Sequence, residues 1–267
     1  MREVTIDRGL LAELGGPGEP VYWERLTSPE IRAVVDRTNA AIIPVGAIEQ
    51  HGPHLPLCVD WLIASHVAQS VSALSGIPVL PPVKYGVSGS HGSFPGTVAL
   101  SPGTFWCVMR DVCDWLYRAG IRQFILLNGH AWNTAPLQVT ADEVRTRYDD
   151  VRVRALDYTE SYPADEVDTH ASHGRLLSHA GYFETSCMLY VAPELIHLER
   201  AVSEGDWPTF WDYRMDQVSG SGVWGRDSSA ANAEIGEREM KRCIETTARA
   251  IIDGVAEPFP EEPEAQG

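Results

Sequence analysis

The sequence predicts an α/β fold, in which a layered and mainly parallel central sheet is flanked by helices within a single domain. Short apolar runs end at glycines, and stretches of helical length lie between them. Hydrophobic and charged residues are spread evenly from about Ala40 to Val255. A continuous apolar run bounded by glycine is typical of a buried parallel strand. Strands that alternate with helices of this length indicate layers of helix and sheet.

The elements can be placed in order along the chain. Two strands are expected within residues 40–52 and 122–133, because AAIIPVG and FILLNG are apolar runs that end in glycine. Further strands are expected at Ile77–Val83 and Val151–Asp157. Amphipathic patterns predict helices at Asp60–Ala73, Pro102–Ala119, Asn133–Tyr148 and Ala230–Val255. Ser101 suits the N-cap of the second helix, since proline follows it at the first helical position.

Composition and charge exclude several classes of partner. The 267 residues carry a formal net charge of −16, so no basic surface exists to neutralise the phosphates of a nucleic acid or an anionic membrane. The chain has no run of about 18 apolar residues and no visible secretory signal. The five cysteines form no CxxC pair, as in reduced proteins. We therefore expect a cytoplasmic protein with one domain, 1–256, and a disordered acidic, proline-rich tail, 257–267.

Histidines and carboxylates gather where the first two predicted strands end. Glu49, His51 and Asp60 lie in EQHGPHLPLCVD, and His130 follows the second apolar run. Glu49 and His51 are two residues apart, so they point to the same side of an extended segment. Because the ligand crevice of an α/β sheet lies beyond the carboxyl ends of its strands, the two loops should meet there. Two carboxylates and two imidazoles suit Zn²⁺, Mn²⁺ or Fe²⁺, and we expect one or two ions per chain.

At these residues the sequence resembles the creatininase family of metal-dependent amidohydrolases. The similar segments are PVGAIEQHGPHLPLCVD (44–60), YGVSGSHGSFPGT (85–97), LLNGHAWN (126–133), SHAGYFETS (178–186) and GVWG (222–225). The resemblance implies a three-layer α/β domain that assembles as a homohexamer. It also implies a set of metal ligands, namely Glu49, His51, Asp60 and His130. Asp60 would bridge the ions where two bind, and His179 would be the acid/base residue.

Several positions depart from creatininase itself, in which a glutamate two residues after the ligand histidine completes the second metal site. Here that position is Trp132, which cannot coordinate a metal. Arg175 and Ser178 stand where creatininase has a tryptophan and a glutamate, and Tyr182 stands where many relatives have a glutamate. We expect these four residues to shape a different substrate pocket, in which Trp132 stacks on a planar group and Arg175 grips a carboxylate. His91 is expected to line the pocket and not to bind the metal.

The predicted function is hydrolysis of a C–N amide-type bond in a small molecule, such as a cyclic amide, a formamide or a short peptide, but not creatinine. Metal-bound water would be the nucleophile, and His179 would supply the proton for the leaving nitrogen. Glu184 would be a further catalytic carboxylate, either beside the metal ligands or as a ligand itself. Two alternatives stay open: a catalytically altered family member that acts as a binding or scaffold protein, and a metal-assisted lyase or isomerase on a carbonyl compound. Metal content would test the first, and release of an amine or ammonia the second.

Overall fold

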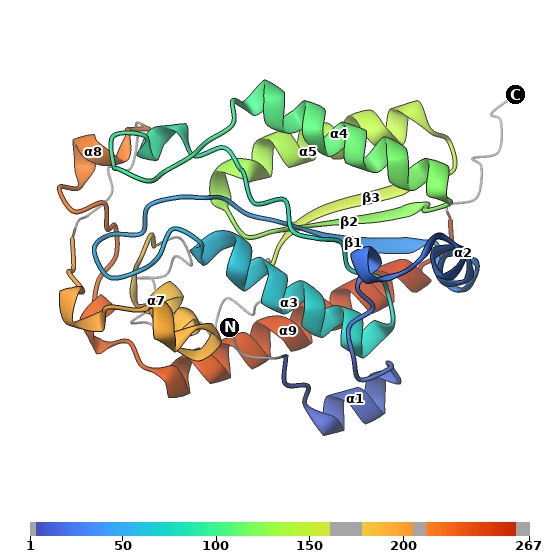
Figure 1. The fold of residues 1–267 in the computed structure, drawn as a ribbon, viewed down its shortest axis with the longest axis horizontal. Coiled ribbons are helices and arrows are strands. Elements are labelled where there is room, and N and C mark those ends of the chain that lie inside the picture. The colour runs from blue at the N-terminus through green and yellow to red at the C-terminus, as the bar shows by residue number, and fades with distance from the viewer. Residues whose placement is uncertain (1–3, 161–177, 205–211, 260–267) are drawn as a thin grey trace, which may run out of the picture.

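Three parallel strands form the centre of the molecule. The computed structural model describes residues 4–160, 178–204 and 212–259 (Figure 1). Strands β1 (Ala40–Val45), β2 (Gln123–Asn128) and β3 (Arg152–Asp157) lie in the order β1-β2-β3, and both pairs are parallel. In the register, Ala40 lies opposite Gln123, which in turn lies opposite Arg152. Each crossover between consecutive strands contains helices, so the α/β fold class is confirmed.

Helices cover both faces of this sheet. Their bounds are α1 Arg8–Leu14, α2 Ser28–Arg37, α3 Val59–Ser75, α4 Pro102–Ala119, α5 Thr134–Arg147, α7 Tyr182–Val191, α8 Met215–Val218 and α9 Ala233–Ala256. Helices α4 and α5 lie over one face, and α3 and α9 lie over the other (Figure 1). The four helices predicted from the sequence correspond to α3, α4, α5 and α9, and their ends differ from the prediction by at most three residues.

Alternate residues of the strands feed two hydrophobic clusters. Ile42 and Leu127 belong to the cluster that includes residues of α3, α7 and α9, whereas Ile43 and Leu126 belong to the cluster on the side of α4. All four side chains are at most 1% exposed. A strand with helices on both faces must be apolar at every position, which explains the unbroken apolar runs in the sequence.

The start of α4 follows the predicted capping chemistry, and α9 begins with a similar cap that was not predicted. The Ser101 side chain accepts a hydrogen bond from the Thr104 N–H (3.2 Å), and Pro102 opens α4. In the same way Asn232 accepts from the Ile235 N–H (3.0 Å) at the start of α9. Both caps satisfy backbone donors that the first turn of a helix leaves unpaired.

The prediction of a strand at Ile77–Val83 was wrong. The segment runs beside β1 and forms single parallel bridges from Val79 to Ile42 and from Val83 to Val45, but no continuous strand. Pro78, Pro81 and Pro82 interrupt it in the sequence. Proline has no backbone N–H, so a regular hydrogen-bonded ladder cannot form across these positions.

The first residues of the predicted tail, 257–259, contact the end of the sheet. Arg152 donates to the carbonyl oxygen of Glu257, and its guanidinium lies 5.4 Å from the ring centroid of Phe259. The rest of the predicted tail, 260–267, lies outside the described residues.

None of the helices in the described part of the chain combines the length and apolar character that a bilayer crossing requires.

Candidate metal centre and active site

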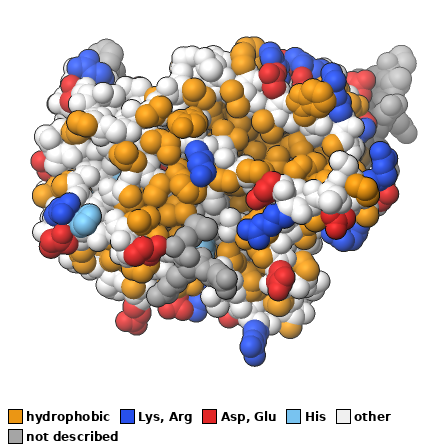
Figure 2. Space-filling model, viewed as in Figure 1, with side chains coloured by type: hydrophobic (Ala, Val, Ile, Leu, Met, Phe, Trp, Pro, Cys, Tyr) orange, Lys and Arg blue, Asp and Glu red, His pale blue; other side chains and the backbone are white. Residues whose placement is uncertain are grey.

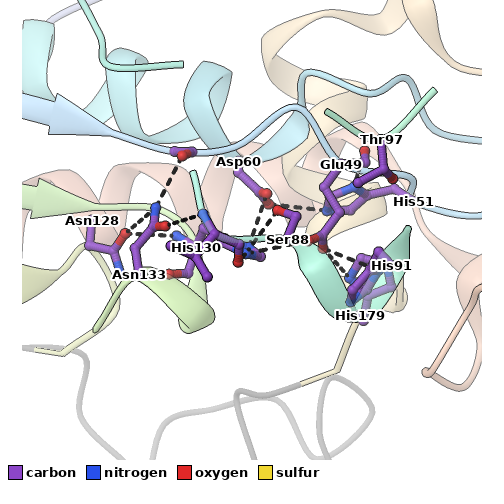
Figure 3. Close-up of polar contacts among 12 residues, drawn as sticks. Glu49, His51, Asp60, Ser88, His91, Thr97, Asn128, His130, Asn133 and His179 are labelled. Carbon is purple, nitrogen blue, oxygen red and sulfur yellow. Dashed lines mark hydrogen bonds and ion pairs between the residues drawn. The ribbon is translucent and has the colours of Figure 1, made fainter. Parts of the chain in front are cut away.

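The four predicted metal ligands come together at the carboxyl ends of β1 and β2. Glu49 and His51 follow β1, Asp60 is the second residue of α3, and His130 follows β2. Their residues are between 1% and 6% exposed. Figure 3 shows the side chains of Glu49, Asp60 and His130 directed toward one another although they come from three separate segments. The parallel sheet therefore brings together residues that are up to 81 positions apart in the sequence.

Two glycines permit this close approach. A Cβ atom at Gly129 would lie 2.4 Å from the backbone oxygen of Asp60 and 2.8 Å from the Cβ of Ala64. A Cβ atom at Gly46 would lie 2.3 Å from the backbone of Trp61. Side chains at either position would push the loops after β1 and β2 away from the start of α3. The glycines in PVGAIEQHG and LLNGHAWN are thus required by packing around the cluster.

The Asp60 carboxylate lies between the two imidazoles. Its Oδ1 atom is 3.1 Å from Nε2 of His51, and its Oδ2 atom is 3.2 Å from Nδ1 of His130. Glu49 approaches from the other side, with Oε2 at 3.3 Å from Nε2 of His130. A carboxylate whose two oxygens face different imidazoles is suited to bridge two positive charges.

Backbone carbonyls already engage one nitrogen of each ring. Nδ1 of His51 lies 3.0 Å from the carbonyl oxygen of Glu49, and Nε2 of His130 lies 3.0 Å from that of Val87. If each ring donates its proton there, the remaining nitrogen presents a lone pair to an Asp60 oxygen. A cation must then lie between these atoms, either a second proton on the ring or a metal ion.

The same electrostatics appear in the pKa values. Burial raises the pKa of Glu49 to about 7. Burial alone would lower the pKa of His51, but the neighbouring carboxylates of Asp60, Glu184 and Glu49 outweigh it and raise that pKa to about 10. Burial likewise opposes the charge on His130, yet Glu49 and Asp60 raise its pKa to about 9. The carboxylates therefore attract positive charge into this buried space.

The residues fit a divalent metal ion. Oε2 of Glu49, Nε2 of His51 and Oδ2 of Asp60 are buried and form no hydrogen bond of acceptable geometry. Buried polar atoms are normally satisfied, and unsatisfied ones call for an explanation such as an ion. Ligand atoms of Glu49, Asp60 and His130 all lie within 4.8 Å of one another. A mixed set of carboxylate oxygens and imidazole nitrogens suits Zn²⁺, Mn²⁺ or Fe²⁺.

The predicted catalytic pair lies beside this cluster. His179 precedes α7, and its Nδ1 is 3.5 Å from Oε1 of Glu49. Glu184 is in the first turn of α7, with Oε1 at 3.9 Å from Nε2 of His51. Burial, together with the nearby His51 and His91, holds the pKa of His179 well below its usual value. His179 is therefore neutral at pH 7 and able to accept a proton.

A cavity of about 310 Å³ opens onto these residues. Asp60, His130, His179 and Glu184 contribute to its wall. Two of the four predicted substrate-binding residues, Trp132 and Ser178, line it as well. The Trp132 side chain is 40% exposed, as expected of a residue at the opening of a cavity.

The other two predicted substrate-binding residues are not brought to this cavity. Tyr182 is the first residue of α7 but is 8% exposed and packs in the hydrophobic core beside α3 and α9. Helix α7 is buried along most of its length, so Tyr182 at its first position packs against the core. Arg175 lies outside the described residues.

Two residues connect the loops around His179: Gln50, which the sequence did not single out, and His91, which was expected to line the pocket and does so. The Gln50 side chain donates to the Gly222 carbonyl oxygen (2.9 Å) and lies 2.9 Å from Nδ1 of His91. Nε2 of His179 is 2.8 Å from the backbone oxygen of Gln50. His91 is 3% exposed, and its Nδ1 is 3.4 Å from Oε1 of Glu49 (Figure 3). In the sequence, only the position of Gln50 between the predicted ligands Glu49 and His51 could have indicated that its side chain lies near the site.

Asparagines hold the His130 loop in place. Asn128 Nδ2 donates to Asp157 Oδ1 (2.6 Å), and Asn128 Oδ1 accepts from the His130 N–H (3.1 Å). Asn133 Nδ2 donates to the Gly46 carbonyl oxygen (3.0 Å), and its Oδ1 accepts from the Val87 N–H (2.9 Å). The loop after β2 is therefore tied to β3, to the end of β1 and to the segment that contains His91.

Comparisons with known proteins agree with this architecture. Residues 24–251 match the creatininase (creatinine amidohydrolase) family. The chain is 31% identical to the creatinine amidohydrolase of Pseudomonas putida over 90% of its own length and 98% of that protein. It is also 31% identical to a mycofactocin precursor peptide peptidase of Mycolicibacterium smegmatis, over 84% of this chain and 88% of that one. A crystal structure of creatinine amidohydrolase superimposes with a TM-score of 0.79 at 30% identity and covers 90% of this chain and 99% of the other. The family match, the sequence identity and the shared fold show that the chain belongs to the creatininase family of amidohydrolases.

Proposed function

We propose that this protein is a metal-dependent hydrolase that cleaves a C–N amide-type bond in a small molecule. The observation that carries the proposal is the buried cluster of Glu49, Asp60 and His130, in which Oε2 of Glu49 and Oδ2 of Asp60 form no hydrogen bond. Asp60 and His130 line a cavity together with His179. Cyclic amides, formamides and short peptides are the substrate classes that fit. Relatives named as a creatinine amidohydrolase and as a peptide peptidase support this range.

The catalytic roles follow from charge and geometry. A divalent ion held by the proposed ligands Glu49, His51, Asp60 and His130 would lower the pKa of a bound water toward about 7 and polarise a carbonyl group. His179 donates one ring proton to the Gln50 carbonyl oxygen, which leaves Nδ1 free to take up a proton and pass it to the leaving nitrogen. Because its pKa is lowered, the His179 imidazole begins neutral and, once protonated, readily gives the proton to the leaving nitrogen, which is the second of these steps. The carboxyl group of Glu184 lies beside His51, with Oε1 at 3.9 Å from Nε2 of that histidine.

Specificity is proposed to depend on Trp132 and Ser178 in the cavity wall. The indole of Trp132 can stack on a planar or apolar group of the substrate. Because Trp132, Arg175 and Ser178 differ from creatininase itself, we propose that creatinine is not turned over at a useful rate. Loss of matched polar partners can weaken a reaction by roughly 10⁴ when the site depends on them.

The cellular setting is also a proposal. All five cysteines have free thiols, which supports a reducing, cytoplasmic location.

Exposed apolar side chains such as Trp115 (69%), Val139 (57%) and Tyr85 (52%) support a homo-oligomer, for which we propose a hexamer. Figure 2 shows apolar side chains spread across one broad face of the molecule.

Metal analysis combined with a substrate screen tests the proposed function. The purified protein should contain at least one divalent metal per chain and release an amine or ammonia from one of a panel of lactams, formamides and short peptides. His130→Ala should lose both the metal and the activity, because one imidazole of the cluster is removed. Trp115→Ala, on the exposed face of α4, serves as the control and should keep the metal. Unchanged metal content in His130→Ala would refute the ligand assignment.

A further inference from the structure

The backbone of His179 is held by a neighbouring loop. His179 precedes α7, and its N–H donates to the Trp224 carbonyl oxygen (2.6 Å). The Trp224 N–H donates back to the His179 carbonyl oxygen (2.9 Å), which makes an isolated antiparallel bridge. The position of the His179 backbone therefore depends on the loop that contains Trp224.

This loop, residues 219–225, follows α8 directly and packs against the segment of the proposed acid/base residue. A Cβ atom at Gly225 would lie 2.5 Å from the Cα of Gly181, so the two backbones touch where neither residue has a side chain. The Gln50 side chain holds the middle of the loop, because its amide donates to the Gly222 carbonyl oxygen (2.9 Å). A shift of the loop would therefore move the backbone on which the acid/base residue lies.

Glu204 contacts both ends of the loop. Its backbone exchanges two hydrogen bonds with that of Gly225, at 3.2 and 3.1 Å. Its side chain reaches the start of the loop, where Oε2 accepts from the Ser219 hydroxyl and from the Ser221 N–H (3.1 Å). The hydrogen bond from Ser219 lowers the pKa of Glu204, so the carboxylate is ionised at neutral pH. Hydrogen bonds to an ionised acceptor are the strong ones, and here they join the two ends of the loop.

Glu204 lies away from the reacting groups. Among the described residues, it neither lines the cavity of about 310 Å³ nor belongs to a cluster of possible metal ligands. Its backbone bonds to Gly225, and the preceding residue, Trp224, bonds to His179. An effect of Glu204 on catalysis would thus pass through the backbone of the loop.

We propose that Glu204 is a positioning residue for His179. By holding the loop 219–225 at both ends, it fixes the bridge that places the histidine. Nε2 of His179 then meets the Gln50 carbonyl oxygen at 2.8 Å, and Nδ1 lies 3.5 Å from Oε1 of Glu49. A misplacement of about 1 Å in a catalytic group can lower a rate by about 10²-fold. The inference rests on the proposed function, because it concerns the acid/base residue of the same site.

Steady-state kinetics of Glu204→Ala on the amide substrate test the inference. The variant should keep its metal content and its KM, whereas kcat should fall about 10–100-fold, because only the placement of the proton-transfer group changes. Glu204→Gln should recover most of this loss, since its amide oxygen can still accept from Ser219 and Ser221. Glu199→Ala is the matched control: its side chain is 69% exposed, and its removal should leave kcat unchanged.

A double-mutant cycle shows whether Glu204 acts through His179. In a His179→Ala background, Glu204→Ala should lower kcat no further, because the group that it positions is already absent. Hydrogen–deuterium exchange followed by mass spectrometry gives a readout independent of activity. The amides of residues 178–181 should exchange faster in Glu204→Ala than in the wild type, because the bridge to Trp224 opens more often.

Ser219→Ala keeps the test decisive if Glu204→Ala does not fold. It removes one donor to the carboxylate and leaves the Ser221 N–H in place. Both kcat and the exchange of residues 178–181 should change in the same direction as in Glu204→Ala, but by less. Wild-type kcat in Ser219→Ala, together with an unfolded Glu204→Ala protein, would give Glu204 a purely structural role and refute the inference.

The remaining outcomes separate this inference from the proposed function. Wild-type kcat in a folded Glu204→Ala protein would refute the inference and leave the proposed function intact. The same holds for an equal loss of kcat with and without His179, since Glu204 would then act elsewhere. A wild-type protein that hydrolyses no amide, or one whose activity survives the removal of His179, would overturn the proposed mechanism and this inference together.

Discussion

At the residue scale, the centre depends on how backbone carbonyls orient two imidazoles around one carboxylate. The carbonyl of Glu49 engages Nδ1 of His51, and the carbonyl of Val87 engages Nε2 of His130. The opposite nitrogens therefore face the two oxygens of Asp60. These side chains are already oriented before a metal binds. They therefore lose little conformational entropy when the ion arrives, which favours tight binding.

His179→Ala tests the division of labour between metal binding and proton transfer. The variant should keep its metal content, because the cluster of Glu49, Asp60 and His130 is untouched. Turnover should fall by about 10²–10⁴, the usual contribution of a general acid–base residue. Metal content by mass spectrometry and the turnover number on the same amide substrate measure the two effects. Full activity without His179 would contradict its assigned role.

The sequence predicted the residues that lie at strand ends better than those that depend on contacts between distant loops. Glu49, His51 and His130 could be placed because parallel strands end at the same edge of the sheet. His91 was expected to line the pocket, but its contacts with Gln50 and Glu49 were not foreseen, because they depend on how segments after β1 and before α4 fold against the loop of Gly222. Tyr182 was expected at the substrate, but the direction in which α7 packs places it in the core.

At the element scale, the loops after β1 and β2 must approach the start of α3 closely. The backbone of Gly129 passes near Asp60, and that of Gly46 passes near Trp61. A small residue at each position lets the carboxyl ends of two strands and the first turn of a helix share one site. The absence of a side chain at these two glycines is therefore what allows the three elements to meet.

Gly129→Ala tests the contact. The added Cβ would lie 2.4 Å from the Asp60 carbonyl oxygen, so the loop or α3 must shift. We expect a loss of stability of about 1–3 kcal/mol, as for overpacked sites, together with weaker metal binding. Gly103→Ala in α4 is the control, because a Cβ there meets no atom within 4 Å. Urea unfolding curves for both variants check the result, and an unaffected Gly129→Ala protein would argue against the close packing.

Most of the elements could be predicted from local signals. The apolar runs of β1 and β2, the Ser101 cap with Pro102, and the amphipathic pattern of α9 are all visible in the sequence. The segment Ile77–Val83 misled the prediction because its apolar character suits a strand while its prolines prevent the ladder. The pattern of apolar residues indicates which residues are buried, but it does not show whether the backbone can form the hydrogen bonds of a sheet.

At the scale of the whole molecule, the fold leaves apolar side chains at the surface away from the described cavity wall. Trp115 and Val139, on α4 and α5, are 69% and 57% exposed. Large exposed apolar surfaces on a protein with a net charge of −16 are consistent with burial between copies of the chain.

Light scattering coupled to size-exclusion chromatography tests the proposed assembly. A hexamer should have six times the 29.4 kDa mass of the chain. Trp115→Asp would place a charge on one of the exposed apolar positions and should lower the mass if α4 contributes to an interface. Trp132→Phe provides a comparison, because that position lines the cavity. A wild-type mass of one chain, independent of concentration, would rule out the oligomer.

The central claim is that Glu49, Asp60 and His130 bind a divalent metal ion at the carboxyl edge of the sheet. Anomalous diffraction at the zinc absorption edge, from crystals of the Zn²⁺-loaded and catalytically active protein, tests it most directly. The account predicts an anomalous peak between these three side chains, about 2.0–2.2 Å from the carboxylate oxygens and the imidazole nitrogen. Active crystals in which no anomalous peak lies between the three residues would contradict it.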